Sequence, residues 1–316
     1  MLPTRPLRLL ALASALAVAL GPLPAGSQPR TADPAVRGVP LSAFPRFVKL
    51  TEHVYGYEEI RQPGFTTVSL VVIGRDGVLI ADGQGSPAAT QTMLDRIRTL
   101  TPLPIKWYVV GSDHGDHTAG NSVLPPGIRY IVHPTSRAQL VRDSAAAAAS
   151  GRTVIVPSTA MTGDSETVDV GTTQVVVRFL GRAHTGGDLM VHLPHEQLLF
   201  MSEAYLNRVF PAMRSAYPSE WARTIDAALA LPDVQHFIPG HGFIETPTVS
   251  REELVTFRDA ITQVIAEVTR LKRAGRSLDE AIQEARWGAL GGWFLANQQG
   301  AIAVRRVWGE LDGTLR

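Results

Sequence analysis

The stretch Gly111–Asn121, GSDHGDHTAGN, concentrates acidic and imidazole side chains in five consecutive positions. It follows an apolar, β-prone run, Lys106–Val110 (KWYVV), so we expect these side chains at the end of a strand. Gly115 allows a tight turn, so that neighbouring side chains converge instead of alternating across a pleat. Two imidazoles and a carboxylate suit zinc or a similar divalent ion. The candidate ligands are His114, Asp116 and His117.

Three later segments each place one further candidate ligand directly after an apolar run and beside Gly or a small residue. These candidates are His184 in GRAHTGGD, Glu203 in FMSE and His241 in PGHG. A lone His in a loop is more often solvated or hydrogen-bonded than bound to metal. Four such segments, each at a predicted strand end, indicate one shared metal centre.

In series, the four segments resemble the signature of the metallo-β-lactamase-fold hydrolases. That signature is a strand followed by His-x-His-x-Asp-His and a Gly, a later His in a Gly-x-x-His-Thr-x-Gly context, a Gly-Asp at a strand end, and Pro-Gly-His-Gly. The resemblance covers about residues 50 to 245 and keeps the order of the segments. It implies a protein of the α/β (α+β) class, with a four-layer αββα sandwich and two metal ions in a cleft at one edge of the sheets.

The resemblance also implies which side chains bind the metal ions. One ion is expected at His114 and His184, the other at Asp116, His117 and His241, with Glu203 bridging them. Zinc, as one or two ions, is the expected cofactor, and iron or manganese stays open because ligand type alone does not select zinc.

The sequence departs from the family signature at two positions. Ser112 stands where the first His is expected, and a neutral hydroxyl is a weak zinc ligand. Glu203 stands where a bridging Asp is usual. Asp113 is a possible substitute ligand beside Ser112. Two metal ions, one metal ion, or a degenerate site without turnover all remain open.

By resemblance, the expected function is hydrolysis, in which a metal-bound hydroxide attacks an ester, lactone, amide (β-lactam-like) or related bond of a small molecule. Asp116 would both ligate the metal and orient the nucleophile. The alternative is a non-catalytic metal- or ligand-binding protein on the same fold. Residues expected to support the ligands by hydrogen bonds are Asp82, Thr185 and Asp188. The aromatic and basic segment 205–217 is expected to line the cleft, with Tyr205, Arg208 and Arg214 as candidate substrate contacts.

Composition limits the alternatives. The 316 residues are 45% hydrophobic, and the formal net charge of +1 gives no field that would attract nucleic acid. The absence of cysteine excludes disulfides, thiolate nucleophiles and Cys-ligated metals. Residues 1–27 have the charged, apolar and small-residue regions of a signal peptide, too short for a membrane span, so we expect a periplasmic or secreted protein without stable membrane insertion. The oligomeric state is left open.

The pattern of elements predicts how the chain is organised. Residues 28–46 are expected to be a loose lead-in, residues 47–248 the metallo-β-lactamase-like domain, and residues 249–316 a helical extension packed on it. Strands are expected at 67–73, 77–81, 105–110, 129–132, 173–180, 189–193, 197–201 and 236–238, and helices at 86–100 and 219–231. Ser250–Glu253 and Ser277–Glu280 have the pattern of capping boxes that open two C-terminal helices.

Overall fold

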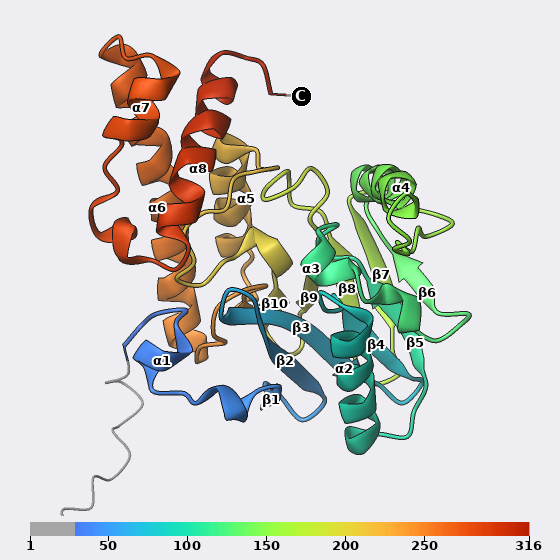
Figure 1. Cartoon of the computed structure of the whole chain (residues 1–316). Helices are drawn as coiled ribbons and strands as arrows, with labels where there is room; N and C mark the ends of the chain where they lie inside the picture. Colours follow the sequence, from blue (N-terminus) through green and yellow to red (C-terminus); the bar gives the residue numbers. More distant parts are fainter. Residues whose placement is uncertain (1–28, 316) are drawn as a thin grey trace, which may run out of the picture.

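Residues 29–315 are described by the computed structural model, in which two β-sheets pack face to face between helices (Figure 1). The signal peptide predicted at residues 1–27 lies outside the described residues. The first sheet contains, in spatial order, β1 (Arg46–Lys49), β2 (Val54–Arg61), β3 (Phe65–Ile73), β4 (Val78–Ala81), β5 (Ile105–Val109) and β6 (Arg129–Ile131). The second contains β11 (His236–Ile238), β10 (Leu198–Phe200), β9 (Met190–Leu193), β8 (Gln174–Arg178) and β7 (Ser165–Asp169).

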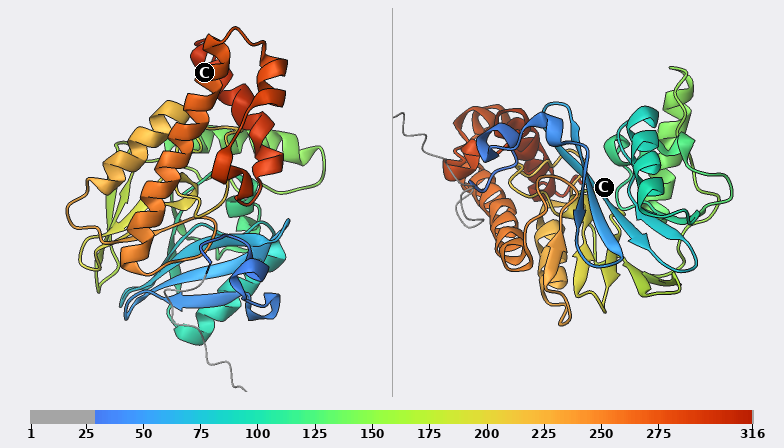
Figure 2. Two further views of the ribbon diagram at one scale, coloured as in Figure 1. Left: turned by 90° about the vertical axis from the view of Figure 1, so that its left-hand side faces the viewer. Right: turned by 90° about the horizontal axis from the view of Figure 1, so that it is seen from below.

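The view from below in Figure 2 shows the four layers. Three clusters of apolar side chains fill the spaces between them. Between the sheets, Leu70 of β3 and Phe200 of β10 belong to one fully buried cluster. Helices α2 (Pro87–Leu100) and α4 (Pro134–Ala148) cover the first sheet, and α5 (Pro218–Leu229), α6 (Pro247–Arg273) and α8 (Ala296–Leu311) cover the second. The predicted four-layer αββα sandwich is confirmed.

The central strand β3 explains why its sequence does not alternate between apolar and polar residues. All of its residues except the last are buried, because one face meets the second sheet and the other meets α2. A strand covered on both faces needs a continuous apolar or small side-chain run, and TVSLVVI supplies it.

Parallel neighbours bring the predicted ligand loops to one edge of the sandwich. Strands β4, β5 and β6 run parallel, as do β10 and β11. The chain leaving β5 forms the short helix α3 (Gly115–Thr118), and the chain leaving β10 forms the 3₁₀ turn η4 (Ser202–Ala204). Side chains that follow these strands therefore meet at the carboxyl ends, where open α/β sheets place their ligands.

The first of the two predicted capping boxes is wrong. Helix α6 already begins at Pro247, and Ser250 is buried inside it, where its hydroxyl accepts a hydrogen bond from the backbone N–H of Phe237 (3.0 Å) and donates one to the carbonyl of Pro247 (2.7 Å). Proline at the first helical position is a competing start signal. The second box is present, with Ser277 and Glu280 capping α7 (Leu278–Glu284).

One expected segment and one expected boundary differ from the structure. The lead-in at 28–46 is not loose where it is described: it contains α1 (Pro34–Arg37), buries Ala32, and joins Arg30 to Glu252 and Glu253 of α6 by ion pairs. The expected boundary at residue 248 falls inside α6, whose apolar face completes the fourth layer. Among residues 29–315, no helix has the length and apolar character that crossing a membrane requires.

Candidate metal centre

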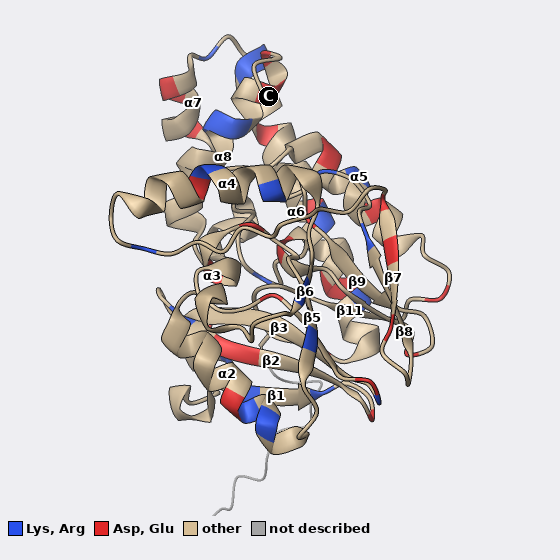
Figure 3. Ribbon diagram, turned by 90° about the vertical axis from the view of Figure 1, so that its right-hand side faces the viewer, with Lys and Arg blue, Asp and Glu red and all other residues tan. Residues whose placement is uncertain are grey.

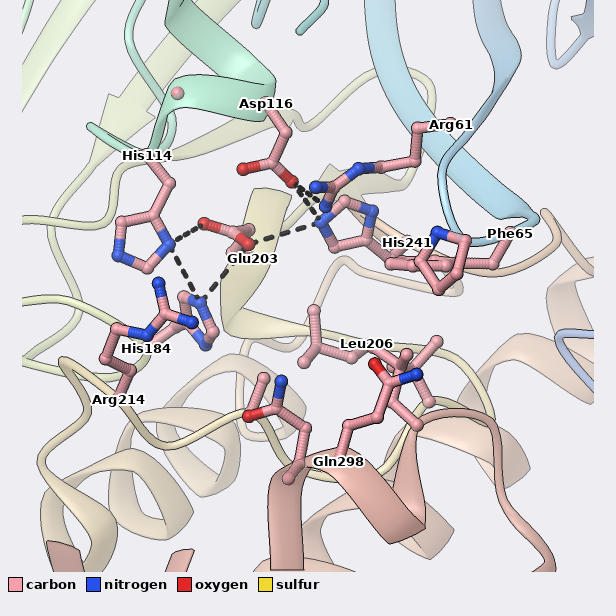
Figure 4. A pocket seen from close by; sticks show the side chains of 16 residues that line it. Arg61, Phe65, His114, Asp116, His184, Glu203, Leu206, Arg214, His241 and Gln298 are labelled. Atoms are coloured by element: carbon pink, nitrogen blue, oxygen red, sulfur yellow. Dashed lines mark hydrogen bonds and ion pairs between the residues drawn. The ribbon is translucent and has the colours of Figure 1, made fainter. Parts of the chain in front are cut away.

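Six of the predicted ligands converge at the carboxyl edge of the two sheets. Figure 4 shows five of them, all except His117. They come from the loop and helix after β5, the loop after β8, the turn η4 and the loop after β11. One group is Asp116, His117, Glu203 and His241, and the other is His114, His184 and Glu203. Within each group, one ligand atom per residue lies within 4.8 Å of the others, and Glu203 belongs to both groups.

The first group is centred on Nε2 of His241. This nitrogen lies 3.0 Å from Oδ2 of Asp116, 3.2 Å from Oε1 of Glu203 and 3.2 Å from Nε2 of His117. His117 and Glu203 are almost fully buried, and only Asp116 of this group is partly open to the cleft.

The second group places two imidazoles against the same carboxylate. Nδ1 of His114 lies 2.9 Å from Oε2 of Glu203, and Nε2 of His184 lies 3.2 Å from Oε1 of Glu203. The two ring nitrogens are 3.1 Å apart. Glu203 therefore presents both of its oxygens to imidazoles that come from different loops.

The ring nitrogens of the first group show that these residues fit a metal ion. Nδ1 of His241 lies 2.8 Å from the carbonyl of Thr66, and Nδ1 of His117 lies 2.9 Å from Oδ2 of Asp82. Both partners can only accept a proton, so each Nδ1 carries one, and the two Nε2 atoms face each other and the carboxylates. Two bare lone pairs would repel at that distance, so a proton on one Nε2 or a metal cation between the two must occupy this space, and a metal ion can replace the proton. Two imidazoles with two carboxylates suit a divalent transition metal.

Electrostatics at the site also favour bound positive charge. Burial lowers the pKa of His117, but the carboxylates of Asp82, Glu203 and Asp116 outweigh it and raise that pKa to about 9. Burial likewise acts against protonation of His114, yet Glu203 above all raises its pKa to about 10. Burial raises the pKa of Glu203 itself, but the surrounding imidazoles hold it well below its usual range. In the metal-free chain, protons on the imidazoles neutralise the buried carboxylates.

Asp82 holds the loop that carries His114, Asp116 and His117 in place through hydrogen bonds. It follows β4 with a left-handed φ of 64°, which brings its carboxylate under the loop. Its Oδ1 accepts hydrogen bonds from the backbone N–H groups of Gly111 (2.7 Å) and Ser112 (3.3 Å), while Oδ2 contacts Nδ1 of His117. A buried carboxylate so engaged sets both the loop path and the orientation of a ligand ring.

Thr185 and Asp188 form a local network beside His184. The hydroxyl and the backbone N–H of Thr185 donate to the two carboxylate oxygens of Asp188, at 2.8 and 2.7 Å. Asp188 is fully buried, and burial raises its pKa to about 6. The network therefore fixes the backbone that carries His184, whose buried Nδ1 has no hydrogen-bond partner among the described residues.

Ser112 and Asp113, the two possible substitute ligands, belong to neither ligand group. Ser112 is buried, and its hydroxyl donates a 2.6 Å hydrogen bond to Oε2 of Glu203. Asp113 lies in neither ligand group, because its side chain turns toward Ser136 of α4. Burial raises the pKa of Asp113 to about 6. Asp113 as a replacement ligand is therefore not supported.

Of the three candidate substrate contacts, only Arg214 lines the cavity at the metal centre. Tyr205 is fully buried and packs against Phe257 of α6 in the core. Arg208 points away from the site and forms a two-pronged ion pair with the buried Glu253. Most residues of the segment 205–217 are buried, and from it Leu206, Val209, Ala212 and Arg214 reach the cavity.

The metal centre opens into a cavity of about 320 Å³. Sequence reasoning missed several of its walls, including Arg61, Phe65, Leu295, Gln298 and Gln299. Arg61 ends β2 and contacts Oδ2 of Asp116. Arg61 lies just before Pro63-Gly64, a turn signal between two strands, and this position could have indicated that it lies at the edge of the sheet. The residues around α8 carry no motif, and only the packing of α8 on α6 brings them to the cavity.

Comparison with solved structures defines the class of fold. No family model matches the chain. The structure is similar to the stereoselective inverting sec-alkylsulfatase Pisa1 from Pseudomonas sp. (TM-score 0.67, 16% identity), over 84% of this chain and 50% of that chain. It is also similar to a metallo-β-lactamase from Pontibacter korlensis (TM-score 0.58, 20% identity, 69% of this chain and 98% of that one). A third similar structure is the DIM-1 metallo-β-lactamase (TM-score 0.56, 22% identity, 69% and 96%).

These similarities establish that the chain has the metallo-β-lactamase fold, as its sequence motifs predict. The chain matches nearly the whole of each β-lactamase but spans only half the length of the sulfatase.

Proposed function

We propose that the protein is a metal-dependent hydrolase of small molecules that uses one or two divalent metal ions, with zinc as the first candidate. The observation that carries this proposal is the pair of ligand groups that share Glu203 and open into a cavity large enough for a small substrate. The solved structures with the same fold include enzymes named for hydrolysis of sulfate esters and of β-lactams, which supports the proposal.

The chain's own residues would bind and orient the reactants. Bound metal would supply Lewis-acid activation of water and of the scissile group. Asp116 keeps its carboxylate ionised, since neighbouring His117 and His241 hold its pKa below the usual range against burial. It is thus able to ligate metal and to accept a hydrogen bond from an attacking water. The cleft needs no Ser or Cys nucleophile.

The walls of the cavity indicate the kind of substrate. Phe65, Leu206, Val209 and Leu295 give it an apolar part, while Arg61 places a guanidinium beside Asp116. An ester, lactone, amide or sulfate ester with an apolar portion fits this mixture. Basic and acidic positions are interspersed over the face in Figure 3, which supports a small-molecule substrate rather than nucleic acid. The predicted signal peptide adds the proposal that the enzyme acts in the periplasm or outside the cell.

A substitution at Asp116 tests the proposed function. The zinc-loaded wild-type protein should hydrolyse at least one member of a panel of p-nitrophenyl esters, lactones, β-lactams and alkyl sulfates. Asp116→Ala should lose at least about a hundredfold in kcat/KM, a loss typical of removing a group that acts in the transition state, while its circular dichroism spectrum is unchanged. Equal activity of the two proteins would contradict hydrolysis at this site. Metal binding without turnover on the whole panel would favour the non-catalytic alternative.

A further inference from the structure

A second cavity, of about 420 Å³, adjoins the one at the metal centre. It lies between α4, the loop 213–217 and α8, and it shares His114, Gly115 and Arg214 with the metal cavity. The two cavities therefore meet along these three residues.

Three arginines from three separate elements line the second cavity: Arg142 of α4, Arg214 of the loop and Arg306 of α8. Basic positions on α4 are blue in Figure 3, and Arg214 lies beside His184 in Figure 4. Among residues 29–315, none of the three is in an ion pair with a carboxylate within 4 Å. Arg142 donates to the amide oxygen of Gln139, and Arg306 donates to the backbone carbonyls of Ser215 and Ala216.

The acidic residues of the same cavity are hydrogen-bonded to neutral groups and form no ion pair with these arginines. Asp143 accepts a hydrogen bond from the amide of Gln139 (2.8 Å), and the carboxylate of Asp113 turns toward the hydroxyl of Ser136. Three guanidinium groups thus face a cavity with two carboxylates, so its arginines outnumber its aspartates, and neither carboxylate is paired with any of the three arginines. A guanidinium matches the planar, two-oxygen edge of a carboxylate, sulfate or phosphate, which a lone ammonium does not.

One side chain links the second cavity to the metal centre. Nδ1 of His114 faces Glu203 at 2.9 Å, whereas Nε2 of the same ring lies 3.3 Å from the hydroxyl of Ser215, a residue that lines the second cavity. The thickness of one imidazole ring therefore separates the two spaces.

We propose that the second cavity is a subsite that binds an acidic group of the substrate, a carboxylate, sulfate or phosphate, remote from the bond that is cleaved. This proposal rests on the proposed function. One substrate would be bound at both places, with its scissile group at the metal centre and its acidic group between Arg142, Arg214 and Arg306. The substrate class is then small esters or related compounds that carry a second, anionic end.

Binding and turnover test the subsite separately. Glutarate binding is measured by calorimetric titration of three proteins: wild type, the double variant Arg142→Gln/Arg214→Gln, and Arg152→Gln. Each protein is measured both with zinc bound and after removal of metal by a chelator. Arg152 is an exposed arginine just after α4, and its side chain donates a hydrogen bond to the hydroxyl of Ser150, so it controls for loss of surface charge. We expect glutarate to bind the stripped wild type and the control equally, and the double variant about tenfold more weakly, as loss of charge-assisted hydrogen bonds predicts.

The turnover arm compares mono-p-nitrophenyl glutarate with neutral p-nitrophenyl butyrate. The ratio of the two kcat/KM values, charged over neutral, should fall about tenfold in the double variant, in line with the binding loss, and stay unchanged in Arg152→Gln. Glutarate binding that disappears on metal removal, or that is equal in wild type and double variant, would overturn the subsite. Failure of the zinc-loaded wild type to hydrolyse either ester would count against the proposed function alone, because the binding arm does not depend on turnover.

Discussion

The hydroxyl of Ser112 donates a 2.6 Å hydrogen bond to Oε2 of Glu203, the carboxylate that the two ligand groups share. Oε1 of the same carboxylate lies 3.2 Å from the ring nitrogens of both His184 and His241. Ser112 occupies the position of a metal ligand in the family signature, and here it orients the shared carboxylate instead. This arrangement makes the two groups unequal: four residues in one, three in the other.

Removing the Ser112 hydroxyl should weaken metal binding at the smaller group. Ser112→Ala leaves Oε2 of the buried Glu203 with one donor fewer, and loss of a hydrogen bond that orients a ligand typically costs about 10- to 100-fold in metal affinity. Competition titration with a chromophoric chelator should show the weaker of the two zinc affinities reduced and the tighter one nearly unchanged. An unchanged weaker affinity would mean that Ser112 does not orient Glu203 for metal binding.

Zinc binding should release protons and become tighter as pH rises. The pKa values of His117 and His114 are about 9 and about 10 in the metal-free chain, so both imidazoles are protonated at pH 7, and a metal ion must displace those protons. Affinity should therefore rise between pH 6 and 8, by about tenfold per pH unit for each proton released. Calorimetry in buffers of different ionisation enthalpy counts the protons. A count of zero at pH 7 would contradict this account.

The carboxylate of Asp82 should affect the affinity for metal and not the affinity for substrate. Asp82→Asn keeps the size of the side chain but removes the charge beside Nδ1 of His117. We expect about 10- to 100-fold weaker zinc binding with little change in KM at saturating zinc. A raised KM at saturating zinc would instead indicate that the loop itself has moved.

Arg208 and Arg214 should separate stability from substrate binding, although they lie six positions apart. Arg208→Met breaks an ion pair with Glu253, whose side chain is 1% exposed, and should destabilise the protein by about 2 to 3 kcal/mol in denaturant unfolding. Arg214→Gln removes an exposed side chain at the cavity and should leave stability within about 0.5 kcal/mol while raising KM for an anionic ester. If Arg208→Met instead raised KM without loss of stability, Arg208 would be a substrate-binding residue.

Much of the fold and the ligand set could be predicted from sequence because strand ends and ligands coincide along the chain. His236–Ile238 is a strand exactly where an apolar run precedes PGHG, and the loop after it carries His241. Local patterns of this kind need no knowledge of distant contacts. Glu203, which follows an apolar run, is predicted by the family resemblance to bridge the two sites, and it belongs to both ligand groups.

The parts that were missed depend on contacts between distant segments. Nothing local distinguishes Tyr205, which is buried against α6, from Arg214, which faces the cavity. Arg61 approaches Asp116 across 55 positions of sequence, and Gln298 reaches the cavity only because α8 packs on α6. The start of α6 was misplaced because two start signals lie three residues apart and tertiary packing buries the serine of the second.

The central claim, a metal-dependent hydrolase, is tested most directly by adding zinc back to chelator-stripped protein while following hydrolysis of the chromogenic panel. The account predicts no hydrolysis of any substrate without metal, and a rate that rises with bound zinc and reaches a plateau at one or two ions per chain. Full activity in the stripped protein, or zinc bound to that stoichiometry with no hydrolysis of any substrate, would contradict it.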